Sequence, residues 1–508
     1  MIRILAIFVL CLSGAFAQSF NVKDFGAVGD GRHKETAAVA RAIEACTKAG
    51  GGTVYFPSGK YLTGAVQLRS NLTLVVGPGA VLLASEDPAD YPLRNSPWAG
   101  DKQQISALIY GENLENVSIS GTGTIDGQGL VWWQRQWLLT PKKNVPMSKT
   151  ITEEQAKVAL AHGRPHLIKI VRSKHVRIEG LTLLNSPSWT VNPVFSQHVN
   201  IAGLTIVNSV PSPNTDGINP ESCRDVHISN CHIDVGDDCI TLKSGKDEAG
   251  RKAGVPEENI TITNCTMRKG HGGVVIGSEM SGGVRNVTIS NCVFQGTDKG
   301  IRIKSQRGRG GVVEGISANN IVMQDVPEPV NITTFYSGKD SIEDRQPVDE
   351  GTPRFRDIRI SNVTARGAKL AGSITGLREM PIEQITLSNV RISAGQGFLI
   401  RNAKDIRFHE VHIDTEKGPA VHGGDIDDLE MSGFRSASPH GATPLIDLGN
   451  IRDLLVRGAW APRGTGVFLR LRGAASAGIV LRENEIGRAE KAVTFADGAQ
   501  ESAVRPAR

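Results

Sequence analysis

The sequence has little of what a disulfide scaffold, a zinc cluster or a nucleic-acid surface requires. Its 508 residues include seven cysteines, with no CxxC pair and no His/Cys cluster. Lysine and arginine number 57 and aspartate and glutamate 52, so the net charge of +5 is too small to hold the chain on nucleic acid. The 57 glycines follow no Gly-X-Y period, which excludes collagen and indicates many turns.

A long apolar run is also missing, except for a short one at the N-terminus. Arg3 precedes an apolar core over residues 4–12, and Ala15-Phe16-Ala17 follows it. This run is shorter than the ~20 residues of a membrane-spanning helix. The pattern predicts a signal peptide over residues 1–17 and an exported, soluble chain without a membrane anchor.

Six cysteines remain after the signal peptide. An even number in an exported protein permits disulfides, yet six in nearly 500 residues do not make a disulfide framework. Burial as small hydrophobic residues is the other reading, and both stay open. The six are Cys46, Cys223, Cys231, Cys239, Cys265 and Cys292.

What the sequence does contain is an internal repeat. Segments 225–231, 259–265, 286–292 and 357–363 share alternating apolar residues followed by an asparagine. A degenerate copy near Asn319-Asn320 and a polar loop over 337–353 fill the widest gap. The marker asparagines are Asn185, Asn208, Asn230, Asn264, Asn291, Asn362 and Asn389.

A period of about 22–27 residues with short strands, polar turns and no helix predicts an all-β fold, a single-stranded right-handed parallel β-helix. Each repeat forms one coil, and coils stack at the ~4.8 Å strand spacing. Alternate residues such as Val226 and Ile228 then face the interior. The asparagines stack at a bend as a ladder of side-chain amides. A leucine-rich repeat lacks its LxxLxLxxN pattern here, and a β-propeller needs ~40-residue blades.

The chain should form one domain over residues 18–508. Residues 35–49 have helical spacing and should form an N-terminal cap helix, with the first coils reaching residue 127. Residues 128–164 look like an excursion with a short helix, because Thr152 and Gln155 form a capping-box pattern. Coils should then run over 165–340 and again over 355–490.

Unusual polar residues recur at equal offsets from the marker asparagines. Because equal offsets become neighbours when coils stack, we expect one patch of three carboxylates, one imidazole and two cations. Each residue alone would be an ordinary turn or surface residue. The offsets are +8 for Asp216, +7 and +8 for Asp237 and Asp238, +7 for His271, and +11 and +13 for Arg302 and Lys304.

Such a patch suits the cleavage of an acetal. Crowded carboxylates repel one another, which raises the pKa of one and keeps it protonated as an acid. A second carboxylate can then activate water while the acid protonates the leaving oxygen. The two cations suit a substrate that carries carboxylates.

These residues resemble glycoside hydrolase family 28, the polygalacturonases and related pectin hydrolases. The resemblance covers roughly Phe20 to Tyr336 and implies a pectin-lyase-like β-helix. The family's four signatures stand in order as Asn214-Thr215-Asp216-Gly217, Gly236-Asp237-Asp238, Gly270-His271-Gly272 and Arg302-Ile303-Lys304.

The resemblance implies a role for each residue. Asp237 would be the general acid, Asp216 and Asp238 the bases that hold the water, and His271 a partner that tunes the acid. Arg302 and Lys304 would bind a galacturonate carboxylate, with Asn214 and Tyr336 also on the substrate. Trp189 and Asn192 either line a subsite or simply pack. No metal or cofactor is implied.

The resemblance implies an inverting hydrolase of the α-1,4 galacturonate linkages of pectin. The excursion over 128–164 favours exo action, the signal peptide predicts secretion, and we expect a monomer. Stacked coils place the carboxylates ~5 Å apart, whereas inversion is associated with ~6.5–9.5 Å. We expect inversion all the same, because the resemblance implies it.

Other functions stay open at this point. A rhamnogalacturonan hydrolase of the same family would share the fold, although such members often depart from parts of the four signatures. A calcium-dependent pectate lyase would use the carboxylates as metal ligands, and a non-catalytic β-helix would only bind polysaccharide.

Overall fold

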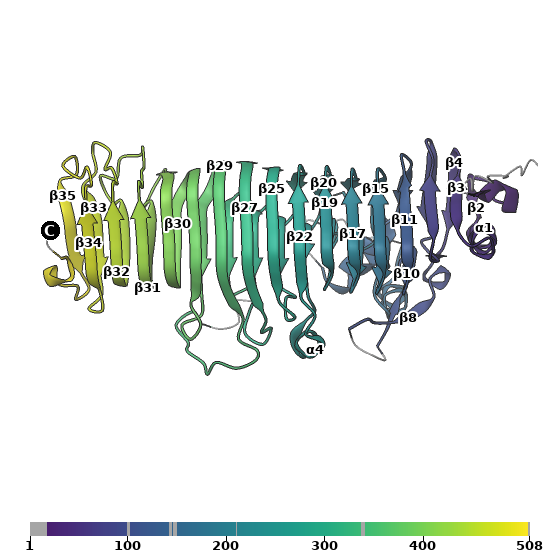
Figure 1. Ribbon diagram of the computed structural model, residues 1–508, viewed down its shortest axis with the longest axis horizontal. Coiled ribbons are helices and arrows are strands. Elements are labelled where there is room, and N and C mark those ends of the chain that lie inside the picture. Colours follow the sequence, from purple (N-terminus) through teal and green to yellow (C-terminus); the bar gives the residue numbers. More distant parts are fainter. Residues whose placement is uncertain are drawn as a thin grey trace, which may run out of the picture.

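The computed structural model describes residues 18–98, 102–141, 145, 150–209, 211–336 and 341–505. Most of its strands pair in parallel and wind into one long right-handed β-helix, as predicted (Figure 1). Each strand pairs with the strand at the same position in the next coil. A coil has three such strand positions, and the stacked strands therefore form three faces. The predicted signal peptide, residues 1–17, lies outside the described residues.

We call the three faces A, B and C. Face A also includes residues 217–221, which join it through bridges at Ile218 and Glu221. Its strands are β5 (Val66–Gln67), β10 (Ile109–Glu112), β13 (Ile168–Val171), β16 (Val191–Val194), β21 (Asp238–Leu242), β24 (Gly272–Gly277), β26 (Lys299–Lys304), β28 (Glu328–Thr333), β33 (Val467–Arg472) and β35 (Lys491–Ala496).

Faces B and C follow face A around each coil. Face B holds β1 (Ser19–Asn21), β3 (Gly52–Phe56), β6 (Leu72–Val76), β11 (Glu115–Gly121), β14 (Lys174–Glu179), β17 (Gln197–Ala202), β19 (Arg224–Ser229), β22 (Glu257–Thr263) and β34 (Ala477–Arg482). Face C holds β2 (Asp30–Lys34), β4 (Gly59–Thr63), β7 (Ala80–Ala84), β12 (Thr124–Asp126), β15 (Thr182–Leu184), β18 (Thr205–Val207), β20 (His232–Val235) and β23 (Thr266–Lys269).

In the second half of the chain, long strands continue around a bend from one face to the next. A short antiparallel pair, β8 (Leu93–Asn95) and β9 (Gln103–Ile105), stands apart from the cylinder. The long strands are β25 (Val284–Gln295), β27 (Val312–Gln324), β29 (Arg354–Thr375), β30 (Ile382–Thr415), β31 (Val421–Ser432) and β32 (Ile446–Arg457).

The interior is a set of apolar stacks, one residue from each coil. Val226, Ile260, Val287 and Ile316 pair in register on successive coils, and all four side chains are buried. Alternation along a strand points every second side chain inward, so a repeat that keeps its register keeps its core.

The marker asparagines stand at the bends, as expected. Six of the seven have a positive φ, between 47° and 57°, a left-handed conformation that asparagine tolerates better than most residues; Asn208 is the exception. Their amides form ladders: Asn389 Nδ2 donates to Asn362 Oδ1 at 2.6 Å, and Asn320 Nδ2 to Asn291 Oδ1 at 2.7 Å.

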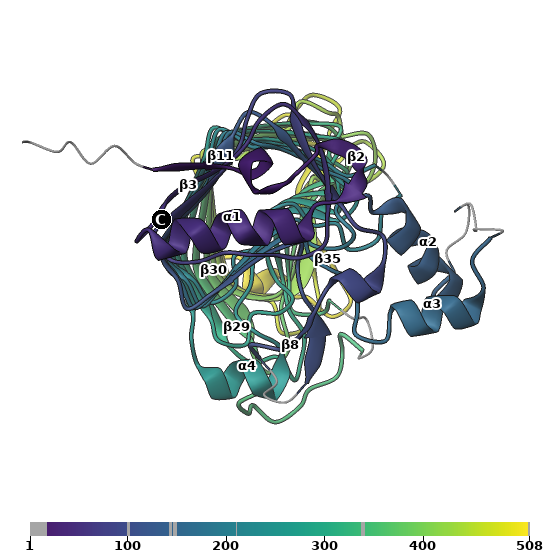
Figure 2. The same ribbon diagram turned by 90° about the vertical axis from the view of Figure 1, so that its right-hand side faces the viewer.

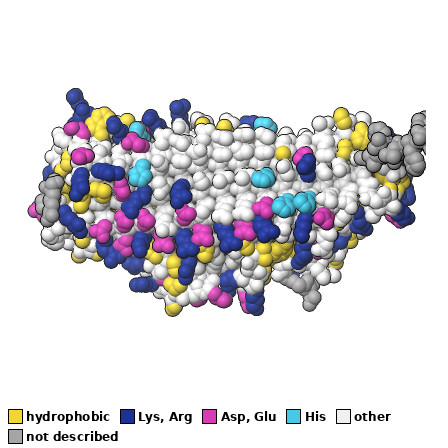
Figure 3. All heavy atoms as spheres, in the orientation of Figure 1, with side chains coloured by type: hydrophobic (Ala, Val, Ile, Leu, Met, Phe, Trp, Pro, Cys, Tyr) yellow, Lys and Arg dark blue, Asp and Glu magenta, His cyan; other side chains and the backbone are white. Residues whose placement is uncertain are grey.

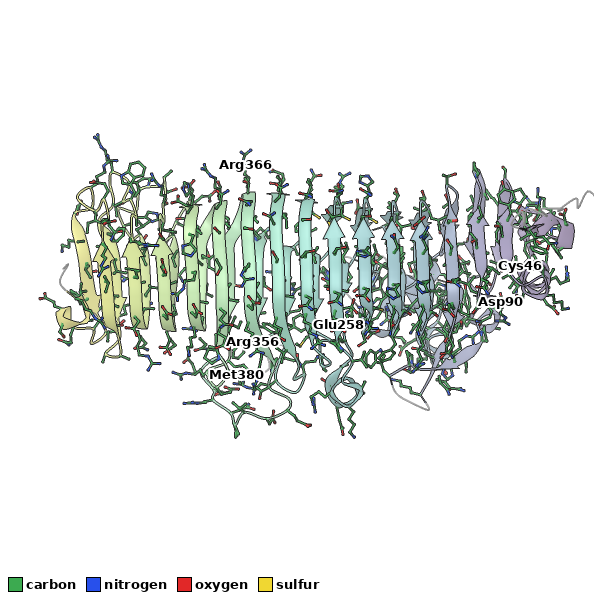
Figure 4. The ribbon with its side chains drawn as sticks, viewed as in Figure 1. Cys46, Asp90, Glu258, Arg356, Arg366 and Met380 are labelled. Carbon is green, nitrogen blue, oxygen red and sulfur yellow. The ribbon has the colours of Figure 1, made fainter. Side chains whose placement is uncertain are left out.

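Among the described residues, four α-helices lie outside the coils or across their end. The helix α1 (Thr36–Lys48) crosses the N-terminal end, where Cys46 and its neighbours pack inward (Figures 2 and 4). Its presence agrees with the sequence, and its role as a cap remains a prediction. The excursion holds two helices rather than one, α2 (Leu130–Leu139) and α3 (Glu153–Ala159).

The helix α4 (Asp247–Ala253) was not expected, because the repeat appeared free of helix. It occupies the turn after β21. A Glu248–Lys252 ion pair of 2.6 Å supports it, and Gly254 ends it at φ 60°. Within the described residues, no helix is long and apolar enough to cross a membrane.

On the face of the molecule that Figure 3 shows, charged side chains lie mostly toward the edges. In Figure 3 the middle of the visible face is largely uncharged, and acidic and basic side chains alternate in a band below it. Glu258 and Arg356, labelled in Figure 4, belong to this edge, and they pair with Arg285 and Glu314 at 2.7 Å. Exposed pairs of this kind add little stability.

The structure separates the two readings of the cysteines. All six are free and buried, and Cys231, Cys265 and Cys292 follow the marker asparagines of consecutive coils.

We therefore expect the native protein to react with a thiol reagent only after unfolding, and the six cysteines of residues 18–508 to yield six thiols without reductant. Fewer than six thiols in the unfolded, unreduced protein would reveal a disulfide and contradict the structure.

Candidate functional site

Two neighbouring coils bring three carboxylates together at the edge of face A. Asp216 and Asp238 each stand two residues before Ile218 and Ile240, which form a bridge with one another. The two aspartates therefore occupy equivalent positions, and Asp237 precedes Asp238. Carboxylate oxygens of all three lie within 4.8 Å of one another. Asp216 and Asp238 are 3% and 2% exposed, whereas the Asp237 side chain is 19% exposed.

His271 and Asn214 flank the most accessible of these carboxylates. His271 Nδ1 lies 3.3 Å from Asp237 Oδ1, because the imidazole stands one coil further along at the same offset. Asn214 Nδ2 donates to Asp237 Oδ2 from the other side at 3.5 Å. The Asp237 carboxylate is thus held between an imidazole and an amide.

Two cations reach the site from the coil beyond His271. Lys304 Nζ lies 2.8 Å from Asp238 Oδ2, and Arg302 Nη1 lies 3.8 Å from Asp238 Oδ1. Arg302 reaches Asp238 over residue 272 of the coil between, which is glycine: a Cβ there would stand 3.3 Å from Asp238 Oδ1 and 3.8 Å from Arg302 Cδ. Tyr336 covers both cations, its ring centre 5.0 Å from Lys304 Nζ.

The structure therefore brings together all eight residues that the sequence singled out. Of the two residues left open, Asn192 is fully buried on face A and its Oδ1 has no hydrogen-bond partner. Thr241 Oγ1 and Arg302 Nε, on later coils of the same face, are also buried without a partner among the described residues. These atoms can bind a sugar hydroxyl or water.

Lys243 is a site residue that the sequence reasoning missed. Its buried ammonium lies 4.0 Å from Asp216 Oδ2, 2.9 Å from Glu279 Oε2 and 4.6 Å from the centre of the Trp189 ring. The signal was present: Lys243 stands at Asn230 + 13, and Lys304 stands at Asn291 + 13. Trp189 thus packs on a cation of the site.

Arg164 was missed for a different reason, because it belongs to the excursion and follows no repeat. Its guanidinium donates to the carbonyl oxygens of Pro187 and Pro213 and to Asn214 Oδ1, at 2.8, 2.6 and 2.8 Å. Burial lowers the pKa of Arg164 to about 10, which leaves it charged near neutral pH. Arg164 fixes Asn214 and, through it, the neighbourhood of Asp237.

The surroundings of the site raise the pKa of Asp216 and lower that of Asp237. Burial, followed by the charge of Asp237, raises the pKa of Asp216 to about 7. Burial also acts against ionisation of Asp237, but the hydrogen bond and charge of His271 outweigh it and lower the pKa of Asp237. The same hydrogen bond raises the pKa of His271. Near neutral pH, Asp216 is therefore protonated in about half of the molecules, whereas an ordinary aspartate would be fully ionised.

The three carboxylates could also surround a cation. Two lysines already supply positive charge there, Lys304 against Asp238 and Lys243 against Asp216. A divalent ion would have to enter against both ammonium groups. The donor set therefore suits proton transfer better than metal binding.

Comparison with known proteins identifies relatives. The model of the glycosyl hydrolases family 28 matches residues 46–410, which include all four motifs. A probable polygalacturonase of Vitis vinifera is 37% identical over 74% of this chain and 74% of its own length. An endo-polygalacturonase of Pectobacterium parmentieri is 30% identical over 72% of this chain and 86% of its own.

Solved structures agree with these sequences. A hyperthermoactive exopolygalacturonase from Thermotoga maritima superimposes with a TM-score of 0.69 at 32% identity, over 78% of this chain and 91% of that one. The names of the relatives thus include both endo and exo action.

The raised pKa of Asp216 has a measurable consequence for stability. Its carboxylate is penalised in the fold but not in the unfolded chain, so wild-type stability falls as the pH rises from about 4 to about 7. Asp216→Asn removes this penalty. We expect the variant to have a higher free energy of unfolding than the wild type. The increase should be larger at pH 8 than at pH 5, and the two increases should differ by at most roughly 3 kcal/mol.

Denaturant unfolding at the two pH values measures this difference. Asp234→Asn, on face C of the same coil, serves as the control and should show no such pH-dependent gain. An equal gain at both pH values, or a larger one at pH 5, would contradict the buried, proton-holding Asp216.

Proposed function

The chain belongs to glycosyl hydrolase family 28, and on this premise we propose that it is a polygalacturonase that hydrolyses the α-1,4 linkages between galacturonate units of pectin. The observation that carries the proposal is the juxtaposition of three carboxylates with two cations on one edge of face A. The carboxylates supply acid and base, and the cations supply a partner for a sugar carboxylate.

We assign the general acid to Asp237, as the family resemblance implies. Asp237 is the most exposed of the three carboxylates, so a glycosidic oxygen can approach it. In the free site its proton is not yet in place, because His271 favours the ionised form. A bound sugar covers Asp237, and the loss of solvent raises its pKa. The proton held on Asp216 then moves to Asp237, because carboxylate oxygens of the two residues lie within 4.8 Å of one another.

Once Asp216 has lost its proton, Asp216 and Asp238 serve as the bases. Both accept hydrogen bonds from a water molecule and hold it against the anomeric carbon. Lys243 keeps the charge of Asp216 neutralised within the buried edge. When the bond breaks, Asp237 gives its proton to the leaving oxygen and the water gives one to a base, so that protons balance.

The two cations orient the substrate. Lys304 is nearly buried, and its ammonium reaches Asp238, whereas Arg302 keeps its buried Nε without a partner in the described part of the chain. A galacturonate carboxylate beside them would complete the charge balance and place the linkage over Asp237. Tyr336 stands over both cations and can cover the sugar ring.

We propose inversion of the anomeric centre, in line with the family. The carboxylate oxygens lie within 4.8 Å of one another, closer than the ~6.5–9.5 Å associated with inverting enzymes. That wider gap leaves room for water between an acid and a base on opposite sides of the sugar. Here two carboxylates share the water and the acid approaches from the side, so the gap is not required.

We also propose exo action, because the excursion reaches the site from one end. A cavity of about 290 Å³ lies between the excursion and face A, lined by Gln136, His162 and Arg164 on one side and Lys169 on the other. Lys169 pairs with Asn192 on the next coil, and the coil of Asp216 follows that one. Lys169 therefore lies two coils before Asp216. Burial lowers the pKa of Lys169 to about 8, so it can still bind a carboxylate. This basic cavity at one end of the site suits the terminal sugar of a chain.

The location of the enzyme follows from its substrate and its N-terminus. Polymeric pectin lies outside the cell that digests it, and residues 1–17 have the pattern of a secretory signal peptide. We therefore propose a secreted monomer that works without metal or cofactor. The repeat and the site together suggest a single domain over residues 18–508.

Replacement of the acid tests the function directly. Asp237→Asn keeps the shape of the side chain but cannot donate a proton, so release of reducing ends from polygalacturonate should fall by about 10²- to 10⁴-fold. Asp234→Asn, three residues away on face C, is the matched control and should keep wild-type activity. Hydrolysis at full rate by Asp237→Asn would contradict the assignment of the acid.

The first products test the stereochemistry and the mode of attack. We expect NMR to detect the β-anomer first, because inversion of an α-linkage yields it, and chromatography to detect monomer alone from the start. An early α-anomer would contradict inversion, and a mixed ladder of oligomers would contradict exo action. Unsaturated products that absorb in the ultraviolet would identify a lyase instead.

A further inference from the structure

Face A continues past the site to the C-terminal end, and there it carries a second pair of basic residues. Strand pairing links Arg302 to Arg470, and Lys304 to Arg472, through the same six coil steps. The positions between the first two are Asn331, Ser373, Leu399, His422 and Asp447, and those between the second two are Thr333, Thr375, Arg401, Gly424 and Gly449.

The second pair also resembles the first in its contacts. Arg472 Nε donates to Asp447 Oδ1 at 2.8 Å, and Arg470 Nη2 contacts Asp447 Oδ2. Asp447 is buried and 6% exposed. In the catalytic site Asp238 is likewise buried between Lys304 and Arg302. The same arrangement therefore occurs at two places on face A: two basic residues, two positions apart on one strand, contact one buried aspartate.

A hollow of about 390 Å³ opens beside this second pair. Its lining includes Gln396, Lys417, His422, Asp447 and Arg472. We call it the C-terminal hollow. Nearby outward positions on β31 and β32 carry glycine, and Arg472 lies across one of them: a Cβ on Gly449 would stand 3.6 Å from Arg472 Nη1. The glycines Gly424 and Gly449 therefore leave room at the base of the hollow, and polar side chains surround it.

The charge of the hollow suits an anion. Asp447 is already neutralised by two guanidinium groups. Lys417 is exposed and has no ion pair with any described residue, and the His422 ring has no hydrogen bond within the same residues. Arg401, one coil before His422 in the neighbouring column, is already paired with Glu343 at 3.6 Å and adds no unbalanced charge. The unbalanced charge of the lining is positive, which favours a carboxylate.

We propose that the C-terminal hollow binds a uronate carboxylate of the same polysaccharide chain whose end lies in the catalytic site. The identity of the ligand rests on the proposed function. Six coil steps of ~4.8 Å place the two basic pairs ~29 Å apart along face A. In the proposed exo mode the end of the chain lies beside the excursion, on the N-terminal side of the catalytic carboxylates, so the uncut remainder of a long chain extends toward the C-terminal coils. The hollow holds this remainder, and long chains bind more tightly than short ones.

The test compares long and short ligands. Lys417→Gln and Arg472→Gln are combined, and the Kd of polygalacturonate and of a galacturonate trimer is measured for wild type and variant. We expect the Kd for the polymer to rise about tenfold, the order expected for one lost charge-assisted contact, while the Kd for the trimer changes less than twofold. Arg482→Gln, an exposed arginine on face B of the same coils, is the control and should match wild type.

Two further readings keep this test decisive. Lys417→Gln alone, on an exposed side chain without an ion pair among described residues, should give part of the effect even if loss of Arg472 disturbs folding. An unchanged polymer Kd in both variants would mean that the arginine pair only fastens the last coils, and would overturn the proposal. So would an equal loss for polymer and trimer.

The outcome is separable from that of the proposed function. If wild type binds polygalacturonate through the hollow but releases no reducing ends, the hydrolase assignment fails and the binding site stands. If it hydrolyses the polymer and the variants bind it as wild type does, the hydrolase stands and the binding site fails.

Discussion

The register between coils is the constraint on which the rest of the structure depends. Parallel strands pair residue by residue, so an equal offset in the repeat becomes a neighbour ~4.8 Å away. This spacing is close to the separation of two interacting carboxylates. Asp216, Asp238 and Gly272 illustrate it: equivalent positions of three coils provide two buried carboxylates and the gap over which Arg302 reaches Asp238.

Charge balance within that register decides what the site can do. Three carboxylates close together at a buried edge would repel strongly, and the cations Lys243, Lys304 and Arg302 together with the raised pKa of His271 oppose this repulsion. The balance is incomplete, because the pKa of Asp216 is still raised to about 7. Asp216 therefore holds a proton over a pH range in which ordinary aspartates are ionised, which is the property that the proposed acid catalysis requires.

The repeat made most of the fold and of the site predictable. Marker asparagines located the bends, alternation located the core, and equal offsets located Asp216, Asp237, Asp238, His271, Arg302 and Lys304. The same rule would have located Lys243 had it been applied to every coil. What lies outside the repeat could not be found in this way. Arg164 and the two helices of the excursion depend on contacts between distant segments, and α4 occupies a turn whose length varies from coil to coil.

We propose that face A holds a galacturonate chain with its scissile linkage over the three carboxylates, and a crystal structure of Asp237→Asn with a bound galacturonate oligomer would test this. We expect a glycosidic oxygen within hydrogen-bond distance of the amide at position 237, a sugar carboxylate on Arg302 and Lys304, and a water shared by Asp216 and Asp238. An oligomer bound away from these residues, or a metal ion in place of the water, would show that the proposal is wrong.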